Sequence, residues 1–290
     1  MKYTKIKYSE YMNIASGQDG AIYSGLLFRF GGSGHCCVYD LKKKELVSEF
    51  TLDRADEFSP HSNAVFFGNE KFDEADEFPL LYTNLYNNYA KQEDRREGTL
   101  CVYRITREGF EFTTKLLQLI KIGFVNDRSL WKSMDDESDI RPYGNFILDH
   151  QTNKLHAFVI RDKDKVTRYF EFDMPRLSDG EICPKCGLKV VVLTKEMNLH
   201  RFDANYAYFI QGACVLDGLL YSVEGGTCAP DNKRVSASRL QIMDLRAHKQ
   251  CGDISLFDHG LYDEPEFIYP YEGVLYYADN RGQVYTVTVE

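Results

Sequence analysis

The chain has 290 residues, of which 43% are hydrophobic, and its formal net charge is −9. This length and composition suffice for a full hydrophobic core, while the acidic balance argues against nucleic acid, whose phosphates require a basic surface. No apolar run approaches the length of a transmembrane helix, and the first residues lack the apolar segment of a signal peptide. We therefore expect a cytoplasmic protein with no nucleic-acid or membrane partner.

The chain begins with a strand-like segment and a first four-strand unit. Residues 2–8 alternate like a strand but have no hairpin partner nearby. Between Gln18 and Leu52, turn-type residues separate four short strand candidates, at residues 19–23, 26–30, 35–41 and 46–52. Short strands joined by tight turns predict one antiparallel sheet.

Four further units follow, and they begin at Pro60, Arg141, Gln211 and Glu264. The strand candidates of the second unit are residues 64–67, 80–84, 99–106 and 110–122. Those of the third are residues 146–148, 155–161, 167–173 and 189–194. The fourth continues from Gln211 with residues 219–223, 239–245 and 253–257. The fifth has only three candidates, at residues 267–269, 274–278 and 283–289.

Two of these units open with nearly the same string. QDGAIYSGLLFRFGG at Gln18–Gly32 aligns without a gap with QGACVLDGLLYSVEG at Gln211–Gly225, and a weaker copy starts at Glu266. Repeats of this kind indicate a β-propeller, in which each copy is the inner hairpin of one blade. We predict an all-β fold with a single domain over residues 1–290. It is a five-bladed β-propeller closed by the N-terminal strand, because residues 2–8 supply the strand that the fifth unit lacks.

A ring of six or seven blades is the alternative architecture. It would need another blade in residues 122–140 or 184–208, and neither segment shows a four-strand pattern. The five-unit interpretation also accounts for the length of the chain, because units two, three and four contain insertions.

Polar side chains stand where each predicted inner strand begins. In a propeller these positions meet at the mouth of the central channel, and their mixture of charges and amides can orient a polar ligand. The candidate ligand-binding residues at the mouth are Gln18, Asp19, His61, Asn63, Arg141, Asn145, Gln211, Glu264 and Glu266.

Each of these residues also has a purely structural interpretation. The glutamines can bond backbone across the channel, Asp19 can cap a turn, and His61 can be a buried, satisfied histidine. Arg141 can pair with Asp139 or Glu266, and Glu264 with Glu266 can form a solvated turn. Catalysis is the other interpretation of these residues. Asp19 and Glu266 come from adjacent blades and can act as an acid and base pair. His61 can serve as a base near neutral pH.

Eight cysteines are present, and Cys183 and Cys186 form the only C-x-x-C motif, CPKCG. Two thiolates in such a turn make half of a tetrahedral zinc site, and the sequence contains no second pair. We therefore expect an unliganded loop and assign neither a cofactor nor a metal. A zinc ion completed by another cysteine remains the alternative.

The hairpin at Gln211–Gly225 with the strand at residues 238–245 resembles the blade of plant-type and bacterial glutaminyl-peptide cyclotransferases. The matching residues are Gln211, Gly212, Gly218, Leu220, Tyr221 and Glu224. The resemblance covers about 40 residues; it implies a five-bladed propeller, a site role for Glu224 and cyclisation of N-terminal glutamine, although fold alone does not fix a reaction. The whole chain also resembles uncharacterised bacterial five-bladed propellers, which implies the fold only.

These observations lead to three hypotheses about function. The first is a propeller that binds a small polar molecule, either a carbohydrate or a peptide end, at the channel mouth. The second is an enzyme that uses the same site, with a glycosidase-like carboxylate pair or as a cyclotransferase. The third is a scaffold that binds proteins through its rims.

Overall fold

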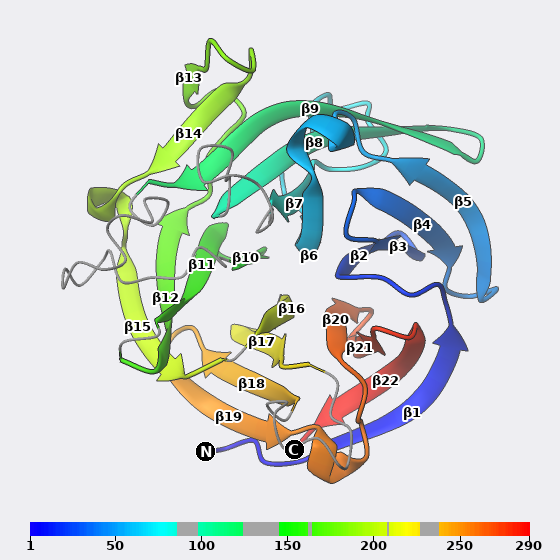
Figure 1. The fold of residues 1–290 in the computed structure, drawn as a ribbon, viewed down its shortest axis with the longest axis vertical. Coiled ribbons are helices and arrows are strands. Elements are labelled where there is room, and N and C mark those ends of the chain that lie inside the picture. Colours follow the sequence, from blue (N-terminus) through cyan, green and yellow to red (C-terminus); the bar gives the residue numbers. More distant parts are fainter. Residues whose placement is uncertain (86–97, 124–144, 162–163, 208, 227–237) are drawn as a thin grey trace.

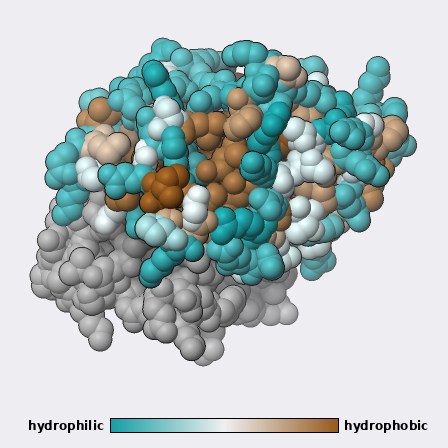
Figure 2. Space-filling model, turned by 90° about the horizontal axis from the view of Figure 1, so that it is seen from above, coloured by the Kyte–Doolittle hydropathy of each residue, from teal (hydrophilic) through white to brown (hydrophobic). Residues whose placement is uncertain are grey.

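The computed structural model describes residues 1–85, 98–123, 145–161, 164–207, 209–226 and 238–290. Five sheets stand around a common axis and form a five-bladed β-propeller, as the sequence predicted (Figure 1). No helix in the described residues is long and apolar enough to cross a membrane. The face shown in Figure 2 is largely hydrophilic around one apolar area.

The strands of blades one, three and four run outward from the axis in chain order, whereas the outermost strands of blades two and five come from elsewhere in the chain. Blade one contains β2 (Gly20–Tyr23), β3 (Leu26–Phe30), β4 (His35–Asp40) and β5 (Glu45–Thr51). Blade two contains β6 (Pro60–Phe67), β7 (Leu81–Leu85), β8 (Thr99–Glu108) and β9 (Glu111–Ile122), and it is extended by β14 (Lys189–Leu193) and β13 (Glu181–Ile182). Blade three contains β10 (Asn145–Asp149), β11 (Lys154–Arg161), β12 (Val166–Asp173) and β15 (His200–Asn205).

Blade four contains β16 (Ile210–Leu216), β17 (Leu219–Glu224), β18 (Arg239–Asp244) and β19 (Lys249–Ser255). Blade five contains β20 (Pro265–Tyr271), β21 (Val274–Asp279), β22 (Gln283–Val289) and β1 (Ile6–Asn13). The described helices are short: α1 (Ala55–Phe58), η3 (Lys195–Met197) and η4 (Phe257–His259).

The repeated strings of the sequence are inner hairpins, and their turns explain why they look alike. Each turn places two consecutive residues at positive φ, a type of two-residue turn that matches the twist of the flanking strands. The pairs are Ser24 and Gly25 (φ 50° and 79°), Asp217 and Gly218 (53° and 76°), and Glu272 and Gly273 (49° and 77°). The glycine recurs because its position demands a left-handed backbone.

The N-terminal strand closes the ring. β1 pairs antiparallel with β22, from Ile6 opposite Val289 to Asn13 opposite Gln283. The first and last strands of the described chain therefore lie side by side at the outer edge of blade five (Figure 1). This pairing confirms the predicted closure and removes a long open edge.

One predicted strand belongs to another blade. Residues 189–194 were expected as the fourth strand of the third unit, but β14 pairs in parallel with β9 of blade two. The outer strand of blade three is β15, which pairs with β12. The valine-rich β14 buries Val191 and Leu193 in its new position, whereas β15 is mostly exposed and has a weak strand pattern. Apolar pattern alone identified a strand and could not identify its partner.

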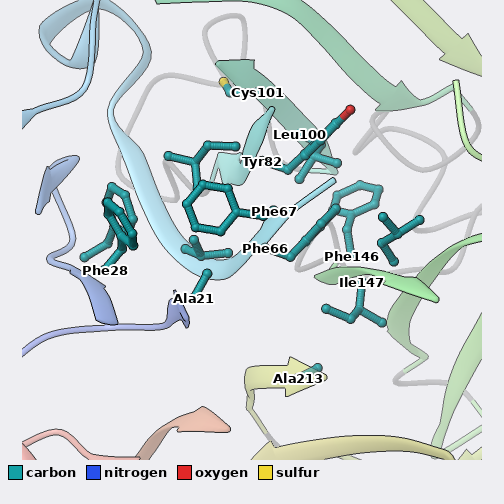
Figure 3. Packing of buried hydrophobic residues seen from close by; sticks show 14 of the residues in the cluster. Ala21, Phe28, Phe66, Phe67, Tyr82, Leu100, Cys101, Phe146, Ile147 and Ala213 are labelled. Atoms are coloured by element: carbon teal, nitrogen blue, oxygen red, sulfur yellow. The ribbon is translucent and has the colours of Figure 1, made fainter. Parts of the chain in front are cut away.

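Aromatic side chains fill the space between the blades. Figure 3 shows Phe66 and Phe67 of blade two lying between Phe28 of blade one and Phe146 of blade three. The ring centroids of Phe28 and Phe67 are 5.2 Å apart at 74°, an edge-to-face contact between neighbouring blades. The aromatic core thus joins adjacent sheets, and polar side chains lie at the axis.

The closing strand gives a test of the ring. Ile6 is 5% exposed and packs into the apolar cluster shared by blades four and five, so we expect Ile6→Ala to lower the free energy of unfolding by about 2–4 kcal/mol. Urea denaturation measures this loss. Ser9→Ala, at an exposed position of the same strand, should change it by less than about 0.5 kcal/mol. Equal effects would mean that β1 does not contribute to closure.

Candidate functional site in the central channel

The five inner strands β2, β6, β10, β16 and β20 surround the axis and contact one another. Side chains at their first residues meet at one end of the channel, which we call the mouth. Their last residues line a cavity at the other end, described below. The mouth contains most of the predicted site residues, and we define the mouth group as Gln18, Asp19, Arg29, Asn63, Asn84, Asn145, Gln211, Glu264 and Glu266.

The two glutamines that align in the sequence bind the two acids of blade five. Gln18 of blade one donates from Nε2 to Glu266 Oε1 over 3.4 Å, and Gln211 of blade four donates to Glu264 Oε1 over 2.7 Å. Blade five stands between blades one and four, so one glutamine approaches it from each side. The structure therefore brings these four predicted residues together.

Asp19 is buried between blades one and two. Its Oδ2 accepts a hydrogen bond from the backbone N–H of Val65 at 2.9 Å, while Oδ1 has no partner among the described residues. Burial raises the pKa of the Asp19 carboxyl well above its usual range. A Cβ on Gly212, which aligns with Asp19, would lie 2.8 Å from Asp19 Oδ1. Blade four therefore needs a glycine at that position.

Arg29 is a buried cation beside these acids, and the sequence analysis missed it. Its Nη2 donates to the carbonyl oxygens of Gly17 and Asp279 at 2.9 and 3.1 Å. Burial lowers the pKa of Arg29, while Glu266 and Asp19 oppose this shift. The available signal was a charged residue inside the otherwise apolar strand LLFRF, where blade four has a serine.

Glu266 is a buried acid of the mouth with a strongly perturbed pKa. Burial raises its pKa to about 9; Arg29 acts in the opposite direction, whereas Glu264 and Asp19 raise it further. Its carboxyl therefore carries a proton at neutral pH. Glu266 Oε2 is buried and has no hydrogen-bond partner among the described residues. The neutral carboxyl can therefore donate or accept a further hydrogen bond.

Asparagines connect the inner strands of blades two, three and four. Asn63 donates from Nδ2 to the carbonyl of Ile210 over 3.3 Å, and Asn145 donates to the carbonyl of Gln211. Asn84, which was not predicted, holds Asn63 in place by donating to its Oδ1 at 2.5 Å. Asn63 and Asn145 thus satisfy backbone groups across the channel, the structural role that the sequence suggested for the glutamines.

The remaining predicted residues lie apart from the mouth acids. His61 is half-buried beside Gly32 of blade one, and burial lowers its pKa. Glu224 is buried in blade four, where its Oε2 accepts a hydrogen bond from Gln241 at 2.8 Å, and burial raises its pKa well above the usual range. Arg141 lies outside the described residues.

A cavity of about 840 Å³ occupies the far end of the channel. It is lined by the last residues of all five inner strands, with Tyr23, Phe66, Tyr269 and Tyr271 among its aromatic side chains. Its polar lining includes Asn69, Glu70, Lys71, Glu74 and His150. Asn69 Oδ1 and His150 Nδ1 are 2.8 Å apart, a bond that joins blades two and three at this cavity. Sequence analysis placed the site at the other end of the same channel.

CPKCG forms the turn between β13 and β14 at the outer edge of blade two. The backbone N–H of Gly187 donates to the carbonyl of Cys183, and hydrogen bonds from the backbone of Cys186 and Lys185 lower the pKa of the Cys183 thiol. No other cysteine or histidine of the described residues joins this pair in a metal-ligating group. Cys228 lies outside those residues.

Comparison with known proteins supports the fold and leaves the activity open. No family model and no curated protein matches the chain. Glutaminyl cyclase of Myxococcus xanthus has a similar structure, with a TM-score of 0.51 and 10% identity over 98% of this chain and 94% of that one. Kuenenia stuttgartiensis hydrazine synthase gives a TM-score of 0.43 at 10% identity, covering 89% and 60%. At 10% identity the likeness to the glutaminyl cyclase is one of fold.

The protonated state of Glu266 gives a pH test. An acid with a raised pKa binds its proton more tightly in the folded chain than in the unfolded chain. The stability that the Glu266 proton contributes is therefore present below about pH 4.5 and is lost as the pH rises towards 9. Relative to Glu266→Gln, we expect the wild-type protein to lose at least about 1 kcal/mol of stability across that window. Urea denaturation at the low and high ends of this pH window measures the change in the free energy of unfolding.

Glu272→Gln is the control, because Glu272 is an exposed carboxylate in the turn between β20 and β21. This variant should follow the wild-type pH dependence. If wild type and Glu266→Gln have parallel stability profiles, Glu266 does not hold its proton in the folded protein.

Proposed function

We propose that the protein binds a small polar molecule, a sugar or the end of a peptide, in its central channel. The observation that carries the proposal is the 840 Å³ cavity to which all five blades contribute. Its volume lies within the usual range of small-molecule sites, roughly 300–1,000 Å³. A site made of strand ends on a closed ring is also rigid, which reduces the entropy lost on binding.

The lining of the cavity suits such a ligand. Tyr23 and Tyr271 are half-buried and present ring faces and edges on which a sugar or peptide group can pack. Amide, imidazole and carboxylate groups stand at Asn69, His150 and Glu74, and these can bond hydroxyl or amide groups in defined directions. Opposite charges at Lys71 and Glu74 favour a polar ligand over an apolar one.

Binding should depend on the aromatic wall. We expect Tyr271→Ala to weaken the ligand by about tenfold, which corresponds to the 1.4 kcal/mol typical of a lost aromatic contact. A thermal-shift screen over sugars, sugar phosphates and short peptides identifies the ligand, and titration calorimetry measures its affinity. His150→Gln, an exposed change, serves as a second variant if Tyr271→Ala is too unstable to titrate.

Tyr262→Ala is the matched control, because Tyr262 is an exposed tyrosine 48% accessible to solvent and does not line the cavity. Its affinity should equal that of wild type. If Glu266→Gln abolishes binding while Tyr271→Ala and His150→Gln leave it intact, the ligand occupies the mouth and the cavity assignment is wrong.

A second candidate function is acid–base catalysis at the mouth, and the proton on Glu266 favours it. A carboxyl that is neutral at neutral pH can donate to a leaving group, as general acids do. The fold resembles that of a glutaminyl cyclase, which suggests N-terminal glutamine as substrate. In that reaction the amine nitrogen attacks the side-chain amide carbon, and ammonia leaves after receiving a proton.

Mass spectrometry of a peptide that begins with glutamine tests this candidate. The wild-type protein should release ammonia from the peptide, and Glu266→Gln should slow the release by at least about a hundredfold, the usual contribution of a general acid. An unchanged peptide after incubation with wild-type protein would eliminate the cyclase hypothesis. The cavity experiment stands independently of this result.

A further inference from the structure

Three metal-ligating side chains from two blades converge outside the channel. Glu171 of β12 and His200 of β15 belong to blade three, and His248 lies in the turn between β18 and β19 of blade four. One potential ligand atom from each lies within 4.8 Å of the other two. Together with His156 of β11, all three line a cavity of about 230 Å³ between the blades.

The strand register explains this convergence. His156 stands opposite Glu171, and Glu171 stands opposite His200, so the three form one row across β11, β12 and β15. Residues directly opposite in neighbouring strands project to the same face of a sheet. His248 reaches that face from blade four, where a positive φ of 48° turns the chain.

The distances suit a small cation. His248 Nε2 and Glu171 Oε2 are 3.6 Å apart, and the rings of His200 and His248 have centroids separated by 4.2 Å. Zinc bonds of 2.0–2.1 Å in tetrahedral geometry place ligand atoms about 3.3 Å apart. Small rotations of side chains that are partly exposed therefore complete the coordination.

His156 provides an independent indication that something is bound here. Its side chain is 1% exposed, it lines the same cavity, and neither ring nitrogen has a hydrogen-bond partner among the described residues. A buried imidazole without partners costs free energy that an ion or its bound water would recover.

We propose that Glu171, His200 and His248 bind a divalent transition-metal ion such as zinc, with His156 facing the remaining coordination position. Imidazole ligands favour zinc, nickel or copper, whereas magnesium and calcium prefer sites built of oxygen. Lys154 and Arg246 also line this cavity, and Lys154 is paired with Asp173. The ion would fasten blade three to blade four.

Two other groups in the described chain can compete for zinc. One is the Cys183 and Cys186 pair, and the other is the cluster of His35, Cys37 and Glu49, in which His35 and Glu49 are exposed. The test therefore uses the full chain, treated with a chelator and then titrated with zinc chloride. Variants are His248→Asn, Glu171→Gln, Cys183→Ser with Cys186→Ser, and Glu49→Gln.

His248→Asn is the decisive variant, because asparagine tolerates the left-handed backbone at this turn and removes the imidazole. We expect one zinc ion per wild-type chain, an affinity at least about tenfold weaker in His248→Asn and Glu171→Gln, and no loss in the other two variants. Bound cobalt should show no thiolate charge-transfer band. Zinc should raise the thermal midpoint of wild type but not of His248→Asn.

Several results would overturn the assignment. Binding by His248→Asn at wild-type affinity would remove the site between the blades. Loss of binding in the double cysteine variant or in Glu49→Gln would assign the ion to one of the competing groups. If wild type takes up neither zinc, nickel nor copper, the cluster carries no metal.

Discussion

The backbone at the axis imposes the constraint on which this structure depends. Each inner strand pairs with its own blade along one edge only, so its other edge presents N–H and C=O groups to the neighbouring inner strands. These groups are buried and need partners. Asp19 supplies an acceptor for the N–H of Val65, and Asn63 and Asn145 supply donors for the carbonyls of Ile210 and Gln211. Polar side chains at the mouth are thus required by the fold before any ligand is considered.

The same constraint shapes the electrostatics of the mouth. A carboxylate placed there to bond a neighbouring strand loses its hydration, and the one buried cation that the described residues place near Glu266, Asp19 and Asp279 is Arg29. Protonation of Glu266 relieves the imbalance, because a neutral carboxyl costs less to bury than an unpaired anion. The burial that the fold imposes on Glu266 therefore also sets its neutral state.

The sequence predicted what is determined locally. The paired glutamines, the two-residue turns with glycine and the closing strand all leave marks on short strings, because each depends on backbone conformation or on a repeated position. The sequence did not predict every pairing between strands that are distant along the chain. β14 has the pattern of any buried strand, and only the coordinates show that it lies beside β9. The 840 Å³ cavity and the row of His156, Glu171 and His200 likewise depend on how strands pair, which no short stretch of sequence indicates.

Different kinds of interaction join neighbouring blades around the ring. Blades one and two are joined by stacked and edge-on aromatic rings, whereas main-chain pairing of β1 with β22 completes blade five itself. Between blades three and four, polar contacts are prominent: Asn205 of β15 bonds Asp253 and Gln250 of β19. Polar contacts near solvent stabilise a seam less than buried apolar surface does. A metal ion held by Glu171, His200 and His248 would add a strong link between these two blades, which gives a physical reason for metal-ligating side chains at this position.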